Sequence, residues 1–200
     1  MLFRSFPLGT NGEFPLVGPD ERVAVIEAVV NEVSDEVPVI AGVGTPGTRR
    51  TVQAAERAEE AGVDGLVVVS PYYFPIDDHG QVEHVRRVAE AVDLPIYCYH
   101  IPSKTGNELS LEAVQELAQI DGVAGLKDSS KDVPWLGQAI DDTPELTFMA
   151  GSDSLLVPGL DLGCAGLVSA VANVAPELVV DLYEAYDDGD RERAKELQSR

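Results

Sequence analysis

Positive charge is scarce in this sequence. Its 200 residues include 14 lysines and arginines against 35 aspartates and glutamates, which gives a formal net charge of −21 at pH 7. Nucleic acids and anionic membranes are bound through basic patches. The scarcity of basic residues therefore excludes both as expected partners.

The acidic residues are spread along predicted helices and do not form a tail. Asp20 and Glu21 lie in one predicted helix, and Glu56, Glu59 and Glu60 lie in the next. Dispersed surface carboxylates repel one another unless dissolved ions screen them. The pattern predicts a halophilic protein from a salt-rich cytoplasm; the alternative is an ordinary acidic enzyme.

Cysteine is also rare, and long apolar runs are missing. Cys98 and Cys164 lie in apolar segments without a metal-ligating partner at short spacing. They are expected to be reduced core residues of a cytosolic protein. No apolar run approaches the roughly 18 residues of a membrane span, and the opening residues 1–7 are too short for a signal peptide. We therefore expect a soluble, cytoplasmic protein.

Short apolar runs alternate with amphipathic stretches along the whole chain. Near-continuous apolar strands that alternate with helices predict a parallel sheet covered by helices. We expect one (β/α)8 barrel domain over residues 1–200 that lacks the first βα unit and part of the C-terminal helical region, because only seven strands are found. The predicted strands are 2–8, 37–42, 65–70, 94–99, 122–127, 146–150 and 165–169, and the predicted helices are 20–33, 48–61, 81–92, 111–119, 133–140, 153–162, 176–186 and 191–198.

An open doubly wound sheet is the rival architecture, since it tolerates seven strands. Gly42, Gly44 and Gly47 form a G-x-G-x-x-G pattern between a strand and a helix, which is typical of dinucleotide binding. However, the next strand does not end in the expected ribose-binding acid, and Pro46 removes a backbone donor where phosphate would bind. A glycine-rich turn of a barrel explains the same residues.

Lys127 is one of only four lysines, and it ends an apolar run. A strand over this run places Val123, Gly125 and Lys127 on one face, so the amine emerges from an apolar wall. Burial disfavours the ammonium form and leaves a free amine that can attack a carbonyl. A snorkelling or ion-paired lysine is the alternative.

The other residues at the ends of the predicted strands supply hydroxyls and phenols. In a barrel, chemistry gathers at these C-terminal ends. The three histidines, His79, His84 and His100, are scattered, so the sequence predicts carbonyl chemistry without a metal or cofactor. The strand ends comprise residues 9–13, 42–46, 71–73, 99–105, 127–130, 151–153 and 169–173.

An ordered set of short motifs resembles the dihydrodipicolinate synthase / N-acetylneuraminate lyase family over essentially the whole chain. The motifs are Thr10 with Gly12-Glu13, Pro71-Tyr72-Tyr73, Tyr99 with Pro102, Gly125-Leu126-Lys127, Gly151 with Asp153, and Asn173-Val174-Ala175-Pro176. The resemblance implies a (β/α)8 barrel, a homotetramer built as a dimer of dimers, and an imine between a lysine and pyruvate.

The resemblance also implies a role for individual residues. Lys127 matches the lysine that forms the imine, Tyr99 the phenol that moves protons, and Thr10 its hydroxyl relay. Tyr73 matches a tyrosine that each subunit of the tight dimer contributes to the site of its partner. Asn11 stands with Thr10 in the turn that binds the pyruvate carboxylate, and we expect Lys104, Gly151 and Ser169 to contact the substrate as well.

Several of these residues have simpler interpretations. Tyr99 could be a core tyrosine and Tyr73 a packing aromatic. His100 alternates away from Tyr99 on its strand, which favours a structural role. Asp128 and Ser129 could cap the following helix or contact the substrate.

Departures from the family pattern bear on the substrate. Lys104 stands where the synthase branch carries an arginine, and a lysine lacks the bidentate fork that grips a carboxylate. Asp128-Ser129-Ser130 replaces the usual Glu-Ala-Ser, and Asn11 replaces a hydroxyl residue. These changes favour a class I aldolase that cleaves 2-keto-3-deoxygluconate-type acids to pyruvate and an aldehyde. The alternatives are 4-hydroxy-tetrahydrodipicolinate synthase and a non-catalytic fragment or ligand-binding remnant.

Overall fold

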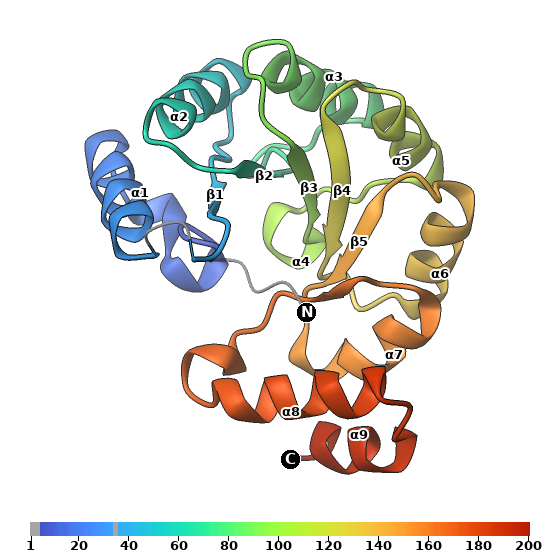
Figure 1. Ribbon diagram of the computed structural model, residues 1–200. Helices are drawn as coiled ribbons and strands as arrows, with labels where there is room; N and C mark the ends of the chain where they lie inside the picture. The colour runs from blue at the N-terminus through green and yellow to red at the C-terminus, as the bar shows by residue number, and fades with distance from the viewer. Residues whose placement is uncertain (1–4, 34–35) are drawn as a thin grey trace.

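The computed structural model describes residues 5–33 and 36–200. Six parallel strands pair in chain order from β1 to β6 and form one curled sheet with helices along its outer side (Figure 1). A doubly wound sheet reverses its strand order at a switch point, and this sheet does not. The predicted barrel architecture is therefore confirmed. The strands are β1 Ile40–Gly42, β2 Gly65–Val69, β3 Ile96–His100, β4 Val123–Asp128, β5 Thr147–Ala150 and β6 Gly166–Leu167.

Several of the helices begin at a residue whose side chain caps the helix. Ser110 caps α5 by accepting a hydrogen bond from Ala113 N, and Asp77 caps α3 by accepting one from Gly80 N. Asp132 caps α6 through Trp135 N, so neither Asp128 nor Ser129 has the capping role considered for it. The helices are α1 Pro19–Val33, α2 Thr48–Glu60, α3 Asp78–Ala89, α4 Pro102–Thr105, α5 Leu111–Ala118, α6 Val133–Asp142, α7 Leu156–Leu162, α8 Pro176–Asp187 and α9 Arg191–Gln198, with 3-10 turns η1 Thr10–Gly12, η2 Phe14–Leu16, η3 Asp153–Leu155 and η4 Val171–Asn173.

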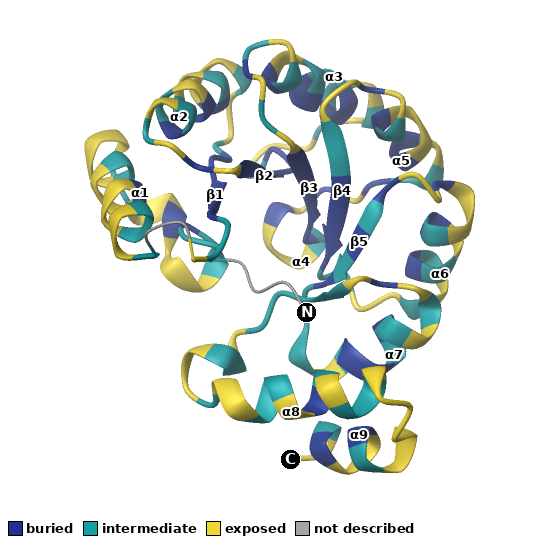
Figure 2. Ribbon diagram, in the orientation of Figure 1, coloured by how far each residue is buried: buried dark blue, intermediate teal, exposed yellow. Residues whose placement is uncertain are grey.

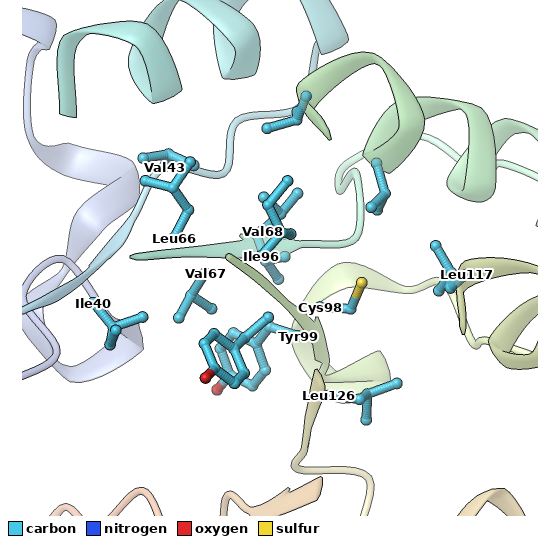
Figure 3. Packing of buried hydrophobic residues seen from close by; sticks show 14 of the residues in the cluster. Ile40, Val43, Leu66, Val67, Val68, Ile96, Cys98, Tyr99, Leu117 and Leu126 are labelled. Atoms are coloured by element: carbon cyan, nitrogen blue, oxygen red, sulfur yellow. The ribbon is translucent and has the colours of Figure 1, made fainter. Parts of the chain in front are cut away.

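The main core lies between the sheet and the helices, and the strands are its most buried part (Figure 2). All five residues of β2 and of β3 are buried. Their side chains alternate between the two faces of the sheet. Figure 3 shows Cys98 pointing toward Leu117 of α5, whereas Tyr99 points to the opposite side. The sheet thus presents one apolar face to the helices and one face to the barrel interior.

The predicted first strand is less regular than expected. Residues 2–4 of that strand lie outside the described residues. Ser5 forms a parallel bridge with Val39, and Pro7 O accepts a hydrogen bond from Gly42 N, so the segment runs beside β1. Pro7 has no N–H to donate, which explains why the pairing does not continue as a regular ladder.

A second, smaller core joins the last helices. Leu156 and Val157 of α7 pack with Leu182 of α8 and with Ala194 and Leu197 of α9. This helical layer covers the end of the sheet near β6 (Figure 1). No helix in the described ranges is both long and apolar enough to cross a membrane.

Candidate active site

Lys127 projects from β4 into the barrel interior and is almost fully buried. Only 5% of the residue is exposed, and its Nζ lies 3.8 Å from the centre of the Tyr99 ring and 5.0 Å from that of Phe6. Burial lowers the pKa of Lys127, and its interaction with the Tyr99 phenol opposes that shift in part. Burial therefore shifts the amine toward its uncharged, nucleophilic form, whereas the neighbouring aromatic rings favour the ammonium form.

Close packing around β4 sets the path of this strand. A Cβ added at Gly125 would lie 2.2 Å from the Thr147 carbonyl oxygen and 3.0 Å from Tyr97 Cδ1. Real side chains do not approach so closely, so only glycine fits between β3 and β5 here. The absence of a side chain at Gly125 lets both neighbouring strands pack tightly below Lys127.

Tyr99 connects the lysine to a hydroxyl. Tyr99 and Lys127 are register partners across β3 and β4, and the Tyr99 hydroxyl lies 3.2 Å from Thr10 Oγ1. Tyr99 is only 4% exposed. An amine, a phenol and a hydroxyl thus lie in sequence, which is an arrangement that can move protons during carbonyl chemistry.

The turn that carries Thr10 is positioned by a close backbone approach. A Cβ at Gly42 would lie 2.2 Å from the Leu8 carbonyl oxygen, so glycine at this position lets the segment before η1 lie against β1. Gly44 is similarly crowded by the Val69 side chain. These contacts explain the first two glycines of the G-x-G-x-x-G pattern as close packing in the barrel wall, whereas a Cβ at Gly47 would meet no heavy atom within 4 Å.

Gly151 lies directly beside Lys127. A Cβ at Gly151 would be 2.0 Å from Ser129 Oγ and 3.0 Å from Lys127 Cε, and Gly151 N donates to the Asp128 carbonyl at 2.7 Å. Glycine is therefore required for the end of β5 to approach the lysine stem.

Ser169 follows β6 and is held by an acid from the neighbouring strand end. Its hydroxyl donates to Asp153 Oδ1 through a short contact, and the N–H groups of Ala170 and Val171 also donate to Asp153. Asp153 thus fixes the turn after β6. The sequence predicted Ser169 as a substrate residue, and the geometry places it on this fixed turn.

Three predicted site residues are exposed at the surface of the single chain. Asn11 of η1 and Lys104 of α4 are exposed. Tyr73 is 83% exposed and packs edge-on against Phe74, with ring centres 4.8 Å apart. Its φ of 82° lies in the left-handed region, which is uncommon for an aromatic residue.

Sequence reasoning missed the function of Asn107. Its side-chain amide donates to the carbonyls of Pro71 and Phe74 and accepts from Ile76 N, at 2.8, 3.0 and 3.0 Å. This buried side chain therefore clamps the loop that carries Tyr73. In the sequence, the only hint of this role that we identify is a polar residue directly after Gly106.

The pair His100 and Asp128 was also missed. Each had been considered alone, His100 as structural and Asp128 as a cap or substrate contact. Their buried side chains meet on the face of the sheet opposite Lys127, with Nδ1 2.9 Å from Oδ1. Among residues 5–33 and 36–200, no group of three or more His, Cys, Asp or Glu side chains is arranged to hold a metal ion.

Comparisons with known proteins identify the family. The model of the dihydrodipicolinate synthetase family matches residues 6–200, so the chain belongs to this family. It is 73% identical over 194 residues to a DapA-like lyase of Halobacterium salinarum, a match that covers 97% of this chain and 64% of the relative. It is 42% identical to 4-hydroxy-tetrahydrodipicolinate synthase of Natronomonas pharaonis, over 96% of this chain and 66% of that protein.

Solved structures share the same fold. The prophage protein YagE of Escherichia coli K12, a member of the dihydrodipicolinic acid synthase family solved in complex with pyruvate, superposes with a TM-score of 0.94 at 34% identity. The match covers 98% of this chain and 67% of that structure. The chain thus spans less than two thirds of the two curated relatives described above.

Proposed function

We propose that this protein is a class I aldolase that forms an imine between Lys127 and a 2-keto acid and cleaves 2-keto-3-deoxygluconate-type acids to pyruvate and an aldehyde. The observation that carries the proposal is the buried Lys127 amine against Tyr99, whose hydroxyl meets Thr10. The membership of the family and the pyruvate bound by YagE support it.

The first half of the reaction uses the lysine. The free amine attacks the ketone carbon of the substrate, and loss of water gives a protonated imine. A lowered pKa of Lys127 keeps the amine available for this step. Since the imine nitrogen itself accepts the electron pair in the next step, the mechanism requires no metal or cofactor.

The second half uses the relay. The C4 hydroxyl gives its proton to the Tyr99 oxygen while the phenolic proton passes to Thr10 Oγ1, 3.2 Å away, and Thr10 releases its own hydroxyl proton to solvent. The C3–C4 bond breaks, its electrons move to the imine nitrogen, and the aldehyde leaves. Protonation of the enamine at C3 and hydrolysis of the imine then release pyruvate and restore the amine.

The nature of the aldehyde distinguishes the two enzymatic candidates. Lys104 is exposed on α4, just after the strand that carries Tyr99, and it cannot form a bidentate contact with a carboxylate. This favours a polyol aldehyde. The name of the Natronomonas pharaonis relative favours the second candidate, 4-hydroxy-tetrahydrodipicolinate synthase. If the protein condenses pyruvate with aspartate semialdehyde faster than it catalyses aldol cleavage, the synthase becomes the better-supported candidate.

We also propose that the protein assembles as a homotetramer in which Tyr73 enters a neighbouring subunit. Among residues 5–33 and 36–200, four large apolar or aromatic side chains are strongly exposed in the single chain, namely Leu16 at 81%, Tyr73 at 83%, Phe74 at 71% and Val174 at 85%. Of these, Tyr73 and Phe74 pack against each other, and exposed apolar side chains that lie together mark protein contacts. The left-handed backbone at Tyr73 fits a side chain held outward for such a contact.

Borohydride trapping tests the function on the full-length gene product. Reduction in the presence of pyruvate is expected to add a reduced pyruvyl group to the peptide that contains Lys127. The adduct should be absent from Lys127→Ala and present in Lys131→Ala, which removes an exposed lysine four residues farther along. An unmodified Lys127 in the wild-type protein would support the non-catalytic alternative and overturn the proposal.

A further inference from the structure

Two buried side chains link the strands that carry the reactive groups. His100 directly follows Tyr99 on β3, and Asp128 directly follows Lys127 on β4. The His100 and Asp128 side chains are 3% and 1% exposed, and they meet at 2.9 Å. Burying such groups is costly unless they are paired and hydrogen-bonded, so a defined arrangement is expected here.

The hydrogen bonds around the histidine define which tautomer a neutral ring adopts. Leu109 N donates to His100 Nε2 at 3.3 Å, so this nitrogen is the acceptor. The proton of a neutral ring therefore lies on Nδ1, which donates to Asp128. The Trp135 ring lies 4.5 Å from the histidine ring and fixes its plane.

The carboxylate is held equally firmly. Ser130 donates to Asp128 twice, from its backbone N to Oδ1 at 3.0 Å and from its hydroxyl to Oδ2 at 2.9 Å. Oδ1 of Asp128 therefore has two donors, His100 and the Ser130 backbone, and Oδ2 has one, the Ser130 hydroxyl. The pair has one orientation relative to both strands.

The strand register gives this link a consequence for the site. Tyr99 pairs with Lys127 and His100 with Asp128. Because side chains alternate between faces, the two pairs project to opposite sides of the sheet. The outer pair thus joins the same two strand ends that present the amine and the phenol to the interior.

The backbone ladder between β3 and β4 is not regular along its whole length. The pairing between β3 and β4 shifts at Ile96 and Tyr97, so an irregularity precedes the reactive residues. A slip by one residue would move Lys127 to the outer face. A directional side-chain link immediately beyond Tyr99 and Lys127 opposes such a slip.

We propose that His100 and Asp128 are positioning residues that hold the Lys127 amine against the Tyr99 phenol in the productive geometry. This inference rests on the proposed role of Lys127 as the nucleophile. The pair touches neither substrate nor the reacting atoms, since it lies behind the strands. Its effect is expected in the rate of imine formation and not in the affinity for pyruvate, because the carboxylate-binding turn of Thr10 belongs to another segment.

The test measures imine formation with pyruvate in the full-length gene product by rapid-quench borohydride trapping. His100→Leu keeps the bulk of the side chain but loses both nitrogens, and it should lower the rate constant at saturating pyruvate on the order of ten- to a hundredfold, as misplacement of a reacting group does. His100→Asn retains a donor near the place of Nδ1 and should stay within about threefold of the wild type. The pyruvate concentration at half-saturation should change little in both.

A control separates positioning from general instability. Leu197→Ala creates a cavity in the second core, remote from the strand ends, and should lower stability without lowering the rate of imine formation at a temperature where it is folded. Ser130→Ala removes one donor to Asp128 in a partly buried loop and should lower the rate by about three- to tenfold.

The outcomes distinguish this proposal from the function on which it rests. If the wild type forms no adduct, the aldolase function fails. If the wild type forms it and folded His100→Leu reacts within about twofold of the wild-type rate, the positioning role is wrong. Should His100→Leu not fold, Ser130→Ala decides: an unchanged rate overturns the proposal, and a reduced rate with unchanged half-saturation supports it.

Discussion

At the scale of single residues, the balance of forces on Lys127 predicts how the reaction responds to pH. Burial lowers the pKa of this amine, whereas the Tyr99 phenol raises it. A lowered pKa means that the free amine is present at a lower pH than for an ordinary lysine, so imine formation should rise with pH around a shifted midpoint. The free energy of unfolding should also rise with pH. The unfolded chain binds the Lys127 proton more tightly than the folded chain does, and this preference for the unfolded state disappears once the proton is lost from both.

Tyr99→Phe isolates the contribution of the phenol. The substitution removes the interaction that raises the pKa of Lys127 and leaves burial in place, so the midpoint of imine formation should move to lower pH. The loss of the proton relay should also slow aldol cleavage by about 10²–10⁴-fold. Borohydride trapping across a pH series measures the first effect. Tyr183→Phe, on α8, serves as the control, and a midpoint that moved upward would contradict the assigned causes.

Gly151 should tolerate no side chain. In Gly151→Ala the new Cβ meets Ser129 Oγ at 2.0 Å and Lys127 Cε at 3.0 Å, so the end of β5 must move away from the lysine. Overpacking of this kind costs about 1–3 kcal/mol of unfolding free energy. Denaturant unfolding and the rate of trapping should both reveal it.

A matched substitution is available for comparison. Gly166 lies in β6, and an added Cβ there has no heavy atom within 4 Å. Gly166→Ala should therefore change stability by less than about 1 kcal/mol. If both variants lost the same amount of unfolding free energy, crowding near Lys127 would not be the cause of the loss in Gly151→Ala.

At the scale of elements, the loops after the strands are fixed by single side chains that reach across from neighbouring segments. Asn107, after α4, clamps the loop between β2 and α3, and Asp153, after β5, clamps the turn after β6. Each clamp satisfies backbone groups that would otherwise lack partners in a packed environment. The loops thus have fixed shapes although they lack regular structure.

Asn107→Ala should release the loop that carries Tyr73. The substitution leaves the carbonyls of Pro71 and Phe74 without their donor, which should cost about 1–3 kcal/mol of stability. Chymotrypsin should then cleave faster after the aromatic residues of this loop. Asn173→Ala makes the same change at an exposed position and should leave the cleavage rate unchanged; a loop equally resistant in both variants would argue against the clamp.

The regular elements could be predicted closely, and the clamps could not. The run 65–70 is continuously apolar and appears as β2 Gly65–Val69, because a strand buried on both faces has this pattern. In contrast, His100 and Asp128 are 28 residues apart, and their pairing depends on the exact register of two strands. The short helix α4 was missed since four residues carry no periodic signal.

At the scale of the whole molecule, charge is poorly balanced. The chain carries 35 acids and 14 bases, and apart from the buried pair of His100 and Asp128, the ion pairs found in the described ranges lie on the exposed surface. Exposed pairs contribute only about 0–1 kcal/mol each. They cannot offset the mutual repulsion of the remaining carboxylates.

Folding is therefore expected to depend on salt. At 0.01 M salt the Debye length is about 30 Å, so carboxylates on neighbouring helices repel one another, whereas at 1 M it is about 3 Å and the repulsion largely vanishes. The melting temperature and the activity should rise together as potassium chloride increases into the molar range. A neutral osmolyte at equal osmolality controls for solvent exclusion, which also strengthens apolar burial.

Neutralising selected acids tests whether repulsion is the cause. Glu56 and Glu60 lie four residues apart on the exposed face of α2, and Glu27 is exposed on the adjacent α1. Like charges at this spacing destabilise a helix by about 0.2–0.5 kcal/mol per pair. The triple change of these glutamates to glutamine should raise the melting temperature in dilute buffer and have little effect in molar salt. A melting temperature of the wild type that stayed flat or fell with added salt would reject the halophilic interpretation, and it would leave the assignment of Lys127 unchanged.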